Sequence, residues 1–387
     1  MLLKIIKIIK FIIKSKKILY PPKQNEILIF DRVGSSTLYE IFPDVLISRT
    51  STISIRGEEL NLYVLLINLF KLKFNRKNYI YSYIKIVNPK ILITYVDNNP
   101  LFYELKKNSE ELTTIFFQNG WRSFDFDIFE KLSQIRNAKD KFYVSYMFVF
   151  GKAINKKYSQ FVKGKVVSIG SIRNNFYIKR NFKKQKIIVY LSQWIETEFS
   201  INNKKYDNKS YSYPCDKLII PELLKFGNKN NLSVFILTRS KHKSKYEDQE
   251  IKYFKREFGS HLNFFERDKY DSSYQIIDSC NLITGVDSTL LYESILRHNK
   301  TCIFSVRGNI LGLRGFNFGW PHNYDSYGEF WTNIPETKKI KNILTNMQNI
   351  SEKKLNELYH NINVKNLMCY DEGNQTANDI LKYELEK

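Results

Sequence analysis

The sequence predicts an α/β protein of two domains that face each other across a cleft. Short apolar runs alternate with segments of helical period from residue 26 onward, as they do in parallel α/β sheets. A polar and basic stretch at 173–185 divides these runs into two series. The length of 387 residues also fits two domains of roughly 150 residues each with additional segments.

The first 19 residues combine lysines and isoleucines at helical spacing. The lysines recur every three or four residues, so they lie on one side of a helix; they are Lys4, Lys7, Lys10, Lys14 and Lys17. No apolar run approaches the roughly 20 residues of a membrane span, and no small-residue cleavage site follows. We therefore expect residues 1–23 to form a basic amphipathic helix on an anionic membrane surface. The alternative is an ordinary helix packed on the domain, with a solvated lysine face.

The first α/β domain is expected at 24–175. Its apolar runs carry few charges, which is typical of strands buried on both faces of a parallel sheet. We expect strands at 27–31, 44–48, 90–96, 113–118, 141–150 and 165–169, and a helix at 60–72.

The second α/β domain is expected at 176–387. We expect strands at 186–192, 232–238, 262–265, 282–285 and 301–306, the last being the final strand. Helices are expected at 217–226, 246–258, 273–280, from 288, at 336–348 and at 373–386. The last helix is a candidate for packing back on the first domain.

Composition excludes several classes of protein. The net charge of +22 comes mainly from lysine, since only 14 of the 61 basic residues are arginine. This bias accompanies many Ile, Asn, Tyr and Phe residues, as an AT-rich genome produces, and we expect no nucleic-acid partner. The four cysteines and five histidines are scattered, which predicts free thiols in a reducing compartment and no metal site.

Three loops in the first domain follow apolar strands, at 31–36, 97–99 and 118–122. Ligands of open α/β sheets bind at the carboxyl ends of strands. Asp31 and Asp97 are therefore candidates for a general base. The other candidate cleft residues are Arg32, Gly34, Glu58, Asn98, Gln118, Asn119, Gly120 and Arg122. The alternative is turn chemistry, because Asn, Asp and Gly also end strands for backbone reasons.

In the second domain an apolar helix opens with Asp287, Ser288 and Thr289. The free N–H groups and positive end of such a helix bind phosphate, and Glu293 one turn later could reach a ribose hydroxyl. A plain helix cap is the alternative. Arg239, after a strand, and Arg314, in a glycine- and aromatic-rich loop, are candidates to stabilise a leaving phosphate. Neither G-x-G-x-x-G nor G-x-x-x-x-G-K-[ST] occurs, which counts against dinucleotide oxidoreductases and P-loop NTPases.

Eight motifs occur together in a fixed order. They are FDRVGS at 30–35, RGEELN at 56–61, PKILITYVDNN at 89–99, FFQNGWR at 116–122, SIGSIRNN at 168–175, GVDSTLLYES at 285–294, GFNFGWP at 315–321 and GEFWTN at 328–333. This order resembles bacterial surface-carbohydrate or O-antigen biosynthesis proteins of the GT-B glycosyltransferase type. The D-S-T-L-x-x-E pattern is also similar to CDP-glycerol polyol-phosphate transferases and to sialyl- or Kdo-type transferases.

The resemblance implies two Rossmann-like domains and a nucleotide-sugar donor, CMP-, CDP- or UDP-linked, with no cofactor or metal. It implies a glycosyltransferase of O-antigen, capsule or other surface polysaccharide synthesis. With the basic N-terminal segment, we expect an enzyme that is peripheral on the inner face of the cytoplasmic membrane and uses a lipid-linked saccharide acceptor. Inverting and retaining chemistry both remain open. The alternatives are a CDP-linked polyol-phosphate transferase, a sugar-nucleotide 2-epimerase and a non-catalytic scaffold of a polysaccharide assembly complex.

Overall fold

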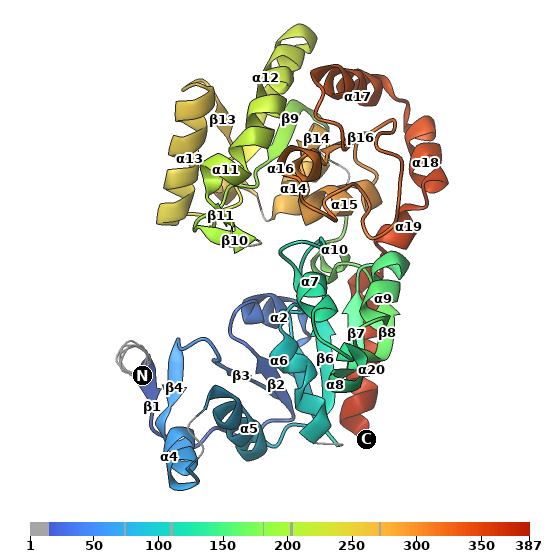
Figure 1. Ribbon diagram of the computed structural model, residues 1–387. Coiled ribbons are helices and arrows are strands. Elements are labelled where there is room, and N and C mark those ends of the chain that lie inside the picture. Colours follow the sequence, from blue (N-terminus) through green and yellow to red (C-terminus); the bar gives the residue numbers. More distant parts are fainter. Residues whose placement is uncertain (1–14, 73–74, 109–110, 181, 202–203, 271) are drawn as a thin grey trace.

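The computed structural model describes the chain except residues 1–14, 73–74, 109–110, 181, 202–203 and 271. Two six-stranded sheets dominate it, and every strand pairing in both is parallel. Figure 1 shows the first sheet in the blue-to-green half and the second in the green-to-red half. The predicted α/β fold of two Rossmann-like units is therefore confirmed.

The first sheet has the order β3-β2-β5-β6-β7-β8. Its strands are β2 (Ile27–Phe30), β3 (Thr50–Ile53), β5 (Ile91–Thr94), β6 (Thr113–Phe117), β7 (Tyr143–Val149) and β8 (Lys163–Ser168). The accompanying helices are α2 (Ser35–Ile41), α3 (Asp44–Ile47), α4 (Leu62–Phe70), α5 (Arg76–Val87), α6 (Pro100–Tyr103), α7 (Ile128–Ser133), α8 (Ala138–Lys141), α9 (Lys152–Ser159) and α10 (Ile172–Phe176). The central strands β2 and β5 are buried throughout, because helices cover both faces of a parallel sheet.

The second sheet has the order β13-β12-β9-β14-β15-β16. Its strands are β9 (Gln185–Leu191), β12 (Ser233–Leu237), β13 (Asn263–Phe264), β14 (Cys280–Gly285), β15 (Thr301–Phe304) and β16 (Trp331–Thr332). Its helices are α11 (Asn208–Tyr211), α12 (Tyr213–Asn230), α13 (Lys245–Phe258), α14 (Ser273–Ser279), α15 (Thr289–Leu296), α16 (Arg307–Leu311), α17 (Thr337–Asn349), α18 (Glu352–Asn361) and α19 (Val364–Leu367). The strand order reverses between β9 and β14, and such a switch point leaves a crevice at the carboxyl ends of the strands.

The last helix, α20 (Gln375–Glu386), returns to the first sheet, beside β7 and β8 in Figure 1. Ala377, Leu381 and Leu385 share a core cluster with side chains of β2, β5 and β6. Glu384 accepts hydrogen bonds from Thr113 and Tyr146. The end of the chain thus ties the two halves together.

The N-terminal prediction is wrong where it can be compared with the structure. Lys17 lies in strand β1 (Lys16–Ile18), which pairs in parallel with β4 (Glu59–Asn61), so the helix expected over 1–23 does not include these residues. Lys4, Lys7, Lys10 and Lys14 lie outside the described residues. None of the described helices is long and apolar enough to cross a bilayer.

Two other local predictions are wrong, and the C-terminal prediction is incomplete. The strand expected at 44–48 is helix α3, because Pro43 directly precedes it and Asp44 lies in its first turn, both of which favour a helix start; strand β3 follows instead. The strand at 301–306 is not the last, since the two-residue strand β16 pairs with β15 and is too short for a periodic signal. Helices α18 and α19 were not expected.

A buried carboxyl group in the second half makes the stability of the fold depend on pH. Asp216 of α12 is fully enclosed and accepts hydrogen bonds from Tyr190 (2.6 Å) and Tyr253 (2.9 Å). Burial raises the pKa of Asp216 from 3.8 to about 6. The folded state therefore holds this proton more tightly than the unfolded state, and stability falls as pH rises from about 4 through about 6.

The substitution Asp216→Asn is expected to remove this dependence. Relative to wild type, the variant should gain about 3 kcal/mol of unfolding free energy between pH 4 and pH 7, because asparagine does not ionise. Urea unfolding at several pH values measures the difference between the two proteins. Parallel stability curves would show that Asp216 does not titrate in this range.

Candidate active site

Two adjoining cavities lie between the carboxyl ends of the two sheets. The first, of about 270 Å³, is lined by Asn98, Trp121, Arg122, Ser123, Phe126, Asp127, Gln193, Tyr211, Arg239, Asp287, Tyr292, Arg307, Gly315, Phe316 and Asn317. The second, of about 550 Å³, is lined by Tyr95, Asn119, Gly120, Trp121, Ser171, Arg173, Leu191, Ser192, Gln193, Leu237, Thr238, Arg239, Arg267, Ser273, Tyr274, Asp287, Ser288, Thr289, Leu290 and Glu293. Trp121, Gln193, Arg239 and Asp287 line both, so the two cavities meet at these side chains.

The start of α15 lies at this junction. Ser288 caps the helix, and its hydroxyl accepts a hydrogen bond from the Leu290 N–H at 3.3 Å. The Thr289 hydroxyl accepts one from the Trp121 N–H of the first half at 2.8 Å. The Trp121 ring stacks on Tyr292 with centroids 3.5 Å apart and planes at 5°. The helix end is therefore held in place by both halves, with Ser288 facing the second cavity.

Glu293 lies one turn further along α15 and lines the second cavity, although it is only 5% exposed. Burial raises its pKa, while hydrogen bonds with Ser171 and Tyr274 oppose the rise. This carboxyl group is therefore fixed in orientation by its neighbours.

Two arginines bring positive charge to the second-sheet side of the cleft. Arg239 follows β12, is exposed, and donates to the Trp194 carbonyl at 3.1 Å. Arg307 is 2% exposed, forms an ion pair with Asp287, and its guanidinium lies 4.2 Å from the centroid of the Tyr211 ring. Burial lowers the pKa of Arg307, but Asp287 together with Tyr211, Cys215 and Tyr190 raises it above its ordinary value.

Arg307 is incompletely satisfied. Within the described part of the chain, its Nε and Nη2 atoms and Oδ1 of Asp287 have no hydrogen-bond partner. Buried polar groups without partners are uncommon and call for an explanation. An anionic oxygen at the edge of the first cavity would supply the missing acceptor for this guanidinium.

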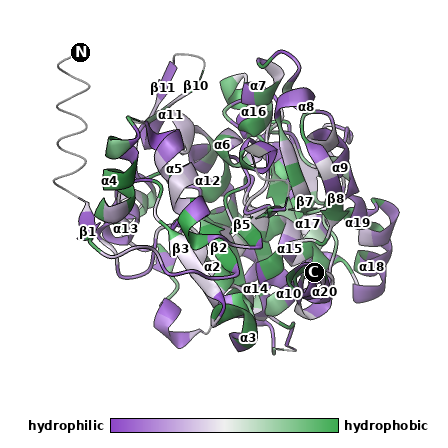
Figure 2. Cartoon of the chain, turned by 90° about the horizontal axis from the view of Figure 1, so that it is seen from below, coloured by the Kyte–Doolittle hydropathy of each residue, from purple (hydrophilic) through white to green (hydrophobic). Residues whose placement is uncertain are grey.

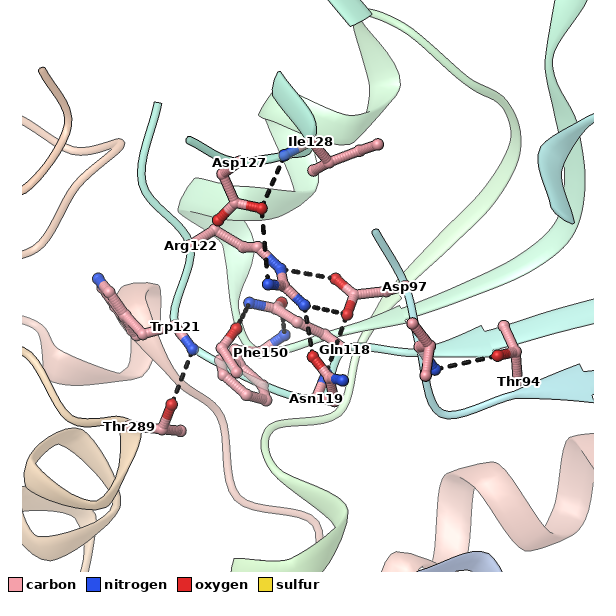
Figure 3. A network of polar contacts seen from close by, with 12 residues as sticks. Thr94, Asp97, Gln118, Asn119, Trp121, Arg122, Asp127, Ile128, Phe150 and Thr289 are labelled. Atoms are coloured by element: carbon pink, nitrogen blue, oxygen red, sulfur yellow. Dashed lines mark hydrogen bonds and ion pairs between the residues drawn. The ribbon is translucent and has the colours of Figure 1, made fainter. Parts of the chain in front are cut away.

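On the first-sheet side, a buried polar network centres on Asp97 and Arg122 (Figure 3). Arg122 donates through Nε to Asp97 at 2.9 Å and also contacts Asn119. Its Nη1 lies 3.6 Å from Asp127. Burial lowers the pKa of Arg122, but Asp97 and Asp127 raise it well above its ordinary value. Arg122 is thus a permanent cation at the edge of the first cavity.

The structure places Asp31 and Asp97, the expected general bases, away from both cavities. Asp97 is fully buried and accepts hydrogen bonds from Asn119, Arg122 and Tyr158. Asp31 is 1% exposed and is held by Arg56 and the Val33 N–H. Neither lines the two cavities, because these hydrogen bonds and ion pairs hold both carboxyl groups in the interior.

The structure brings some predicted residues to the cleft and places others elsewhere. Those lining one or both cavities are Asn98, Asn119, Gly120, Arg122, Arg239, Asp287, Ser288, Thr289 and Glu293. Gln118 lines neither cavity, and its side-chain amide forms hydrogen bonds with the backbone of Gly120 and Phe150.

Besides Asp31, Asp97 and Gln118, four further predicted residues lie outside these cavities. Arg32 pairs with Glu59, and Glu58 accepts from Ser54. Gly34 has φ +79 and its backbone lies against the Tyr95 ring. Arg314 pairs with Asp125 of the first half at 2.7 Å, so it bridges the two halves instead of facing a phosphate.

Several residues that line the cavities were not predicted, among them Asp127, Arg307 and Gln193. Asp127 caps α7, where it accepts from the Ile128 N–H at 2.7 Å and the Ser123 N–H at 3.1 Å. It follows a loop without regular structure, so no strand end indicated it. Arg307 and Gln193, however, lie shortly after strands β15 and β9. The expectation that ligands bind at the carboxyl ends of strands therefore applied to both.

The fold and cleft define a protein of the GT-B type, with two Rossmann-like units and a site between their carboxyl edges. A family model described as "putative O-antigen biosynthesis protein" matches residues 115–385. This chain belongs to that family. None of the curated proteins matches the sequence.

Solved structures with this fold include two kinds of enzyme. The wall teichoic acid polymerase TagF, H444N variant with CDPG, is 12% identical, with a TM-score of 0.52 over 95% of this chain and 90% of that one. The UDP-GlcNAc 2-epimerase of Methanocaldococcus jannaschii with UDP-GlcNAc and UDP is 12% identical, with a TM-score of 0.53 over 92% and 99%. That of Neisseria meningitidis bound to UDP-GlcNAc is 11% identical, with a TM-score of 0.50 over 96% and 99%.

Proposed function

We propose that this protein is a glycosyltransferase of surface polysaccharide synthesis, which moves a sugar from a nucleotide-linked donor to a lipid-linked glycan. The observation that carries the proposal is the junction of the two cavities, where the start of α15, Arg239 and the unsatisfied Arg307 converge. Family membership and the nucleotide ligands of the similar structures support it. In this proposal residues 176–387 bind the donor and residues 24–175 the acceptor, at the inner face of the cytoplasmic membrane.

The nucleoside would occupy the second cavity, whose volume lies in the range of small-ligand sites. Ser288 and the free N–H groups of α15 would bind phosphate oxygens, and Glu293 would accept from the ribose. Arg307 would stabilise the negative charge that develops on the leaving phosphate. These side chains carry the electrostatic part of the reaction without a metal or cofactor.

Asp127 is the carboxylate of the first half that lines the first cavity. Burial raises its pKa, and Arg122 only partly opposes this, so the group is more basic than an exposed aspartate. In an inverting reaction the acceptor oxygen would bond to the anomeric carbon while the bond from that carbon to the phosphate oxygen breaks. Asp127 would take the hydroxyl proton.

Thermal unfolding with a panel of UDP-, GDP-, CDP- and CMP-sugars tests donor binding. A ligand at 100 times its dissociation constant should stabilise the protein by about 2.7 kcal/mol. Stabilisation by CDP-glycerol alone would favour a polyol-phosphate transferase. Interconversion of UDP-GlcNAc with its 2-epimer would identify an epimerase. If no nucleotide sugar stabilises the protein, the non-catalytic scaffold becomes the favoured alternative.

The substitution Ser288→Asp is expected to weaken donor binding by about thirtyfold, because it places a carboxylate where phosphate binds. Aspartate is also a good helix cap, so the fold should survive. Ser351→Asp at the exposed start of α18 is the matched control and should leave affinity unchanged. Calorimetry measures both, and wild-type affinity in the Ser288 variant would place the phosphate elsewhere.

A further inference from the structure

Helix α4 exposes several large apolar side chains, while its buried side holds Val64 and the polar Asn68. Tyr63, Leu66, Leu69 and Phe70 are 41%, 51%, 41% and 87% exposed, and their spacing places them on one face. Asn68 is 2% exposed and bonds the Val64 carbonyl (2.8 Å) and the Ser82 hydroxyl (3.1 Å). A surface helix in water normally turns its polar residues outward. We call the exposed apolar side chains of this face, with the adjoining Leu19, Tyr20 and Leu72, the α4 patch.

Two neighbouring segments of the chain contribute to the α4 patch. Leu19 and Tyr20 are 68% and 79% exposed and directly follow β1, which pairs with the β4 strand before α4. The Asn61 side chain at the start of α4 donates to the Tyr20 carbonyl at 2.9 Å. Leu72, 78% exposed, extends the patch beyond the helix end. Figure 2 shows α4 coloured as hydrophobic at the edge of the molecule, beside β1.

Basic residues border the α4 patch. The segment 60–77 contains Lys71, Lys73, Arg76 and Lys77 and no acidic residue. Glu58 and Glu59 precede it, and Glu59 pairs with Lys16 at 3.8 Å. Lys16, Lys17, Lys71 and Arg76 are exposed next to the patch in the chain. The preceding residues 1–14 add four lysines and no acid. Exposed aromatic and aliphatic side chains with a basic border are complementary to the interface of an anionic bilayer.

We propose that the α4 patch inserts into an anionic lipid surface and is a folded membrane-docking site, additional to residues 1–14. This inference deepens the proposed function and rests on its lipid-linked acceptor, which the enzyme must reach at a membrane. Apolar side chains that are exposed in the isolated protein would then be buried among lipid chains, and the lysines would contact phosphate headgroups.

The test is flotation of the full-length protein with vesicles of phosphatidylcholine and phosphatidylglycerol in equal parts. The double variant Leu66→Gln, Phe70→Gln removes the centre of the patch while glutamine keeps the helix propensity. We expect its partition coefficient to fall by about a hundredfold, or tenfold for each side chain. The matched control, Val45→Gln with Ile178→Gln, replaces residues that are 58% and 65% exposed elsewhere, and should bind as wild type does.

Four outcomes would overturn the proposal. Wild-type vesicle binding by the Leu66, Phe70 variant, with its thermal unfolding unchanged, would show that the patch does not contact lipid. Equal binding to pure phosphatidylcholine vesicles would remove the role of the basic border. If the wild type dimerises without lipid and the variant does not, the patch binds a second copy of the chain. If residues 1–14 are proteolysed faster in the variant while vesicle binding is unchanged, the patch binds the chain's own N-terminal segment.

Donor binding is measured separately on the same proteins. The α4 patch lies outside both cleft cavities, so the double variant should keep the wild-type response to nucleotide sugars. Loss of vesicle binding with donor binding intact supports the patch. A protein that binds vesicles through the patch but no nucleotide would contradict the proposed function and leave the docking site standing.

Discussion

The substitution Arg122→Met is expected to lower the free energy of unfolding by about 3–5 kcal/mol, because it leaves a buried carboxylate without its cation. Asp97 is fully buried and Arg122 is 7% exposed. The remaining N–H and O–H donors around Asp97 cannot neutralise its charge. Urea unfolding monitored by tryptophan fluorescence measures the loss, and the expected cost is a large part of a domain's total stability.

A double variant, Arg122→Met with Asp97→Asn, separates the effect of charge from that of packing. Removing both charges should recover about 2 kcal/mol of the loss, since residues in one ion-pair network are not additive. Asp140→Asn on the exposed helix α8 loses only an exposed ion pair to Lys163 and serves as the control. If the single and double variants were equally destabilised, the Asp97–Arg122 pair would contribute packing and not charge.

This network also explains which parts of the site the sequence could indicate. The strands that carry it, β5 and β6, are continuous apolar runs, and their ends were correctly placed within a few residues. The direction of each side chain after the strand was not predictable, because it depends on partners distant in sequence. Asp97 turns toward Arg122 and Tyr158, while its neighbour Asn98 faces the cavity.

The same distinction holds for the fold. Long apolar runs with helical connections predicted the two parallel sheets, since burial on both faces leaves a strong local pattern. Other elements leave a weaker pattern in the sequence. Strand β1 forms by pairing with β4 in the folded chain, and helix α3 begins after Pro43. For α4 the helical period was visible, but its exposed face was not, because an apolar residue ordinarily indicates the core.

The substitution Asp127→Asn is expected to lower kcat by about a hundredfold to ten-thousandfold while donor affinity stays near wild type, because it removes the proposed base and leaves the donor cavity unchanged. Asparagine still caps α7 through its amide oxygen. The substitution loses one hydrogen bond, from the Ser123 N–H, which contributes about 1 kcal/mol of stability. It also loses the ion pair with Arg122 at 3.6 Å. Sugar transfer to a membrane lipid fraction measures kcat, and calorimetry measures donor affinity.

A pH profile separates a base from a structural cap at Asp127. Activity of the wild type should fall as pH falls through the pKa of Asp127, which burial raises, because the protonated carboxyl cannot accept the hydroxyl proton. The residual activity of Asp127→Asn should lack this acidic limb. Asp140→Asn, the same replacement on an exposed helix of the same half, should keep both the rate and the limb. If the Asp127→Asn enzyme keeps the wild-type rate and pH profile, another group takes the proton. If it keeps the profile but has a reduced rate, Asp127 only positions Arg122.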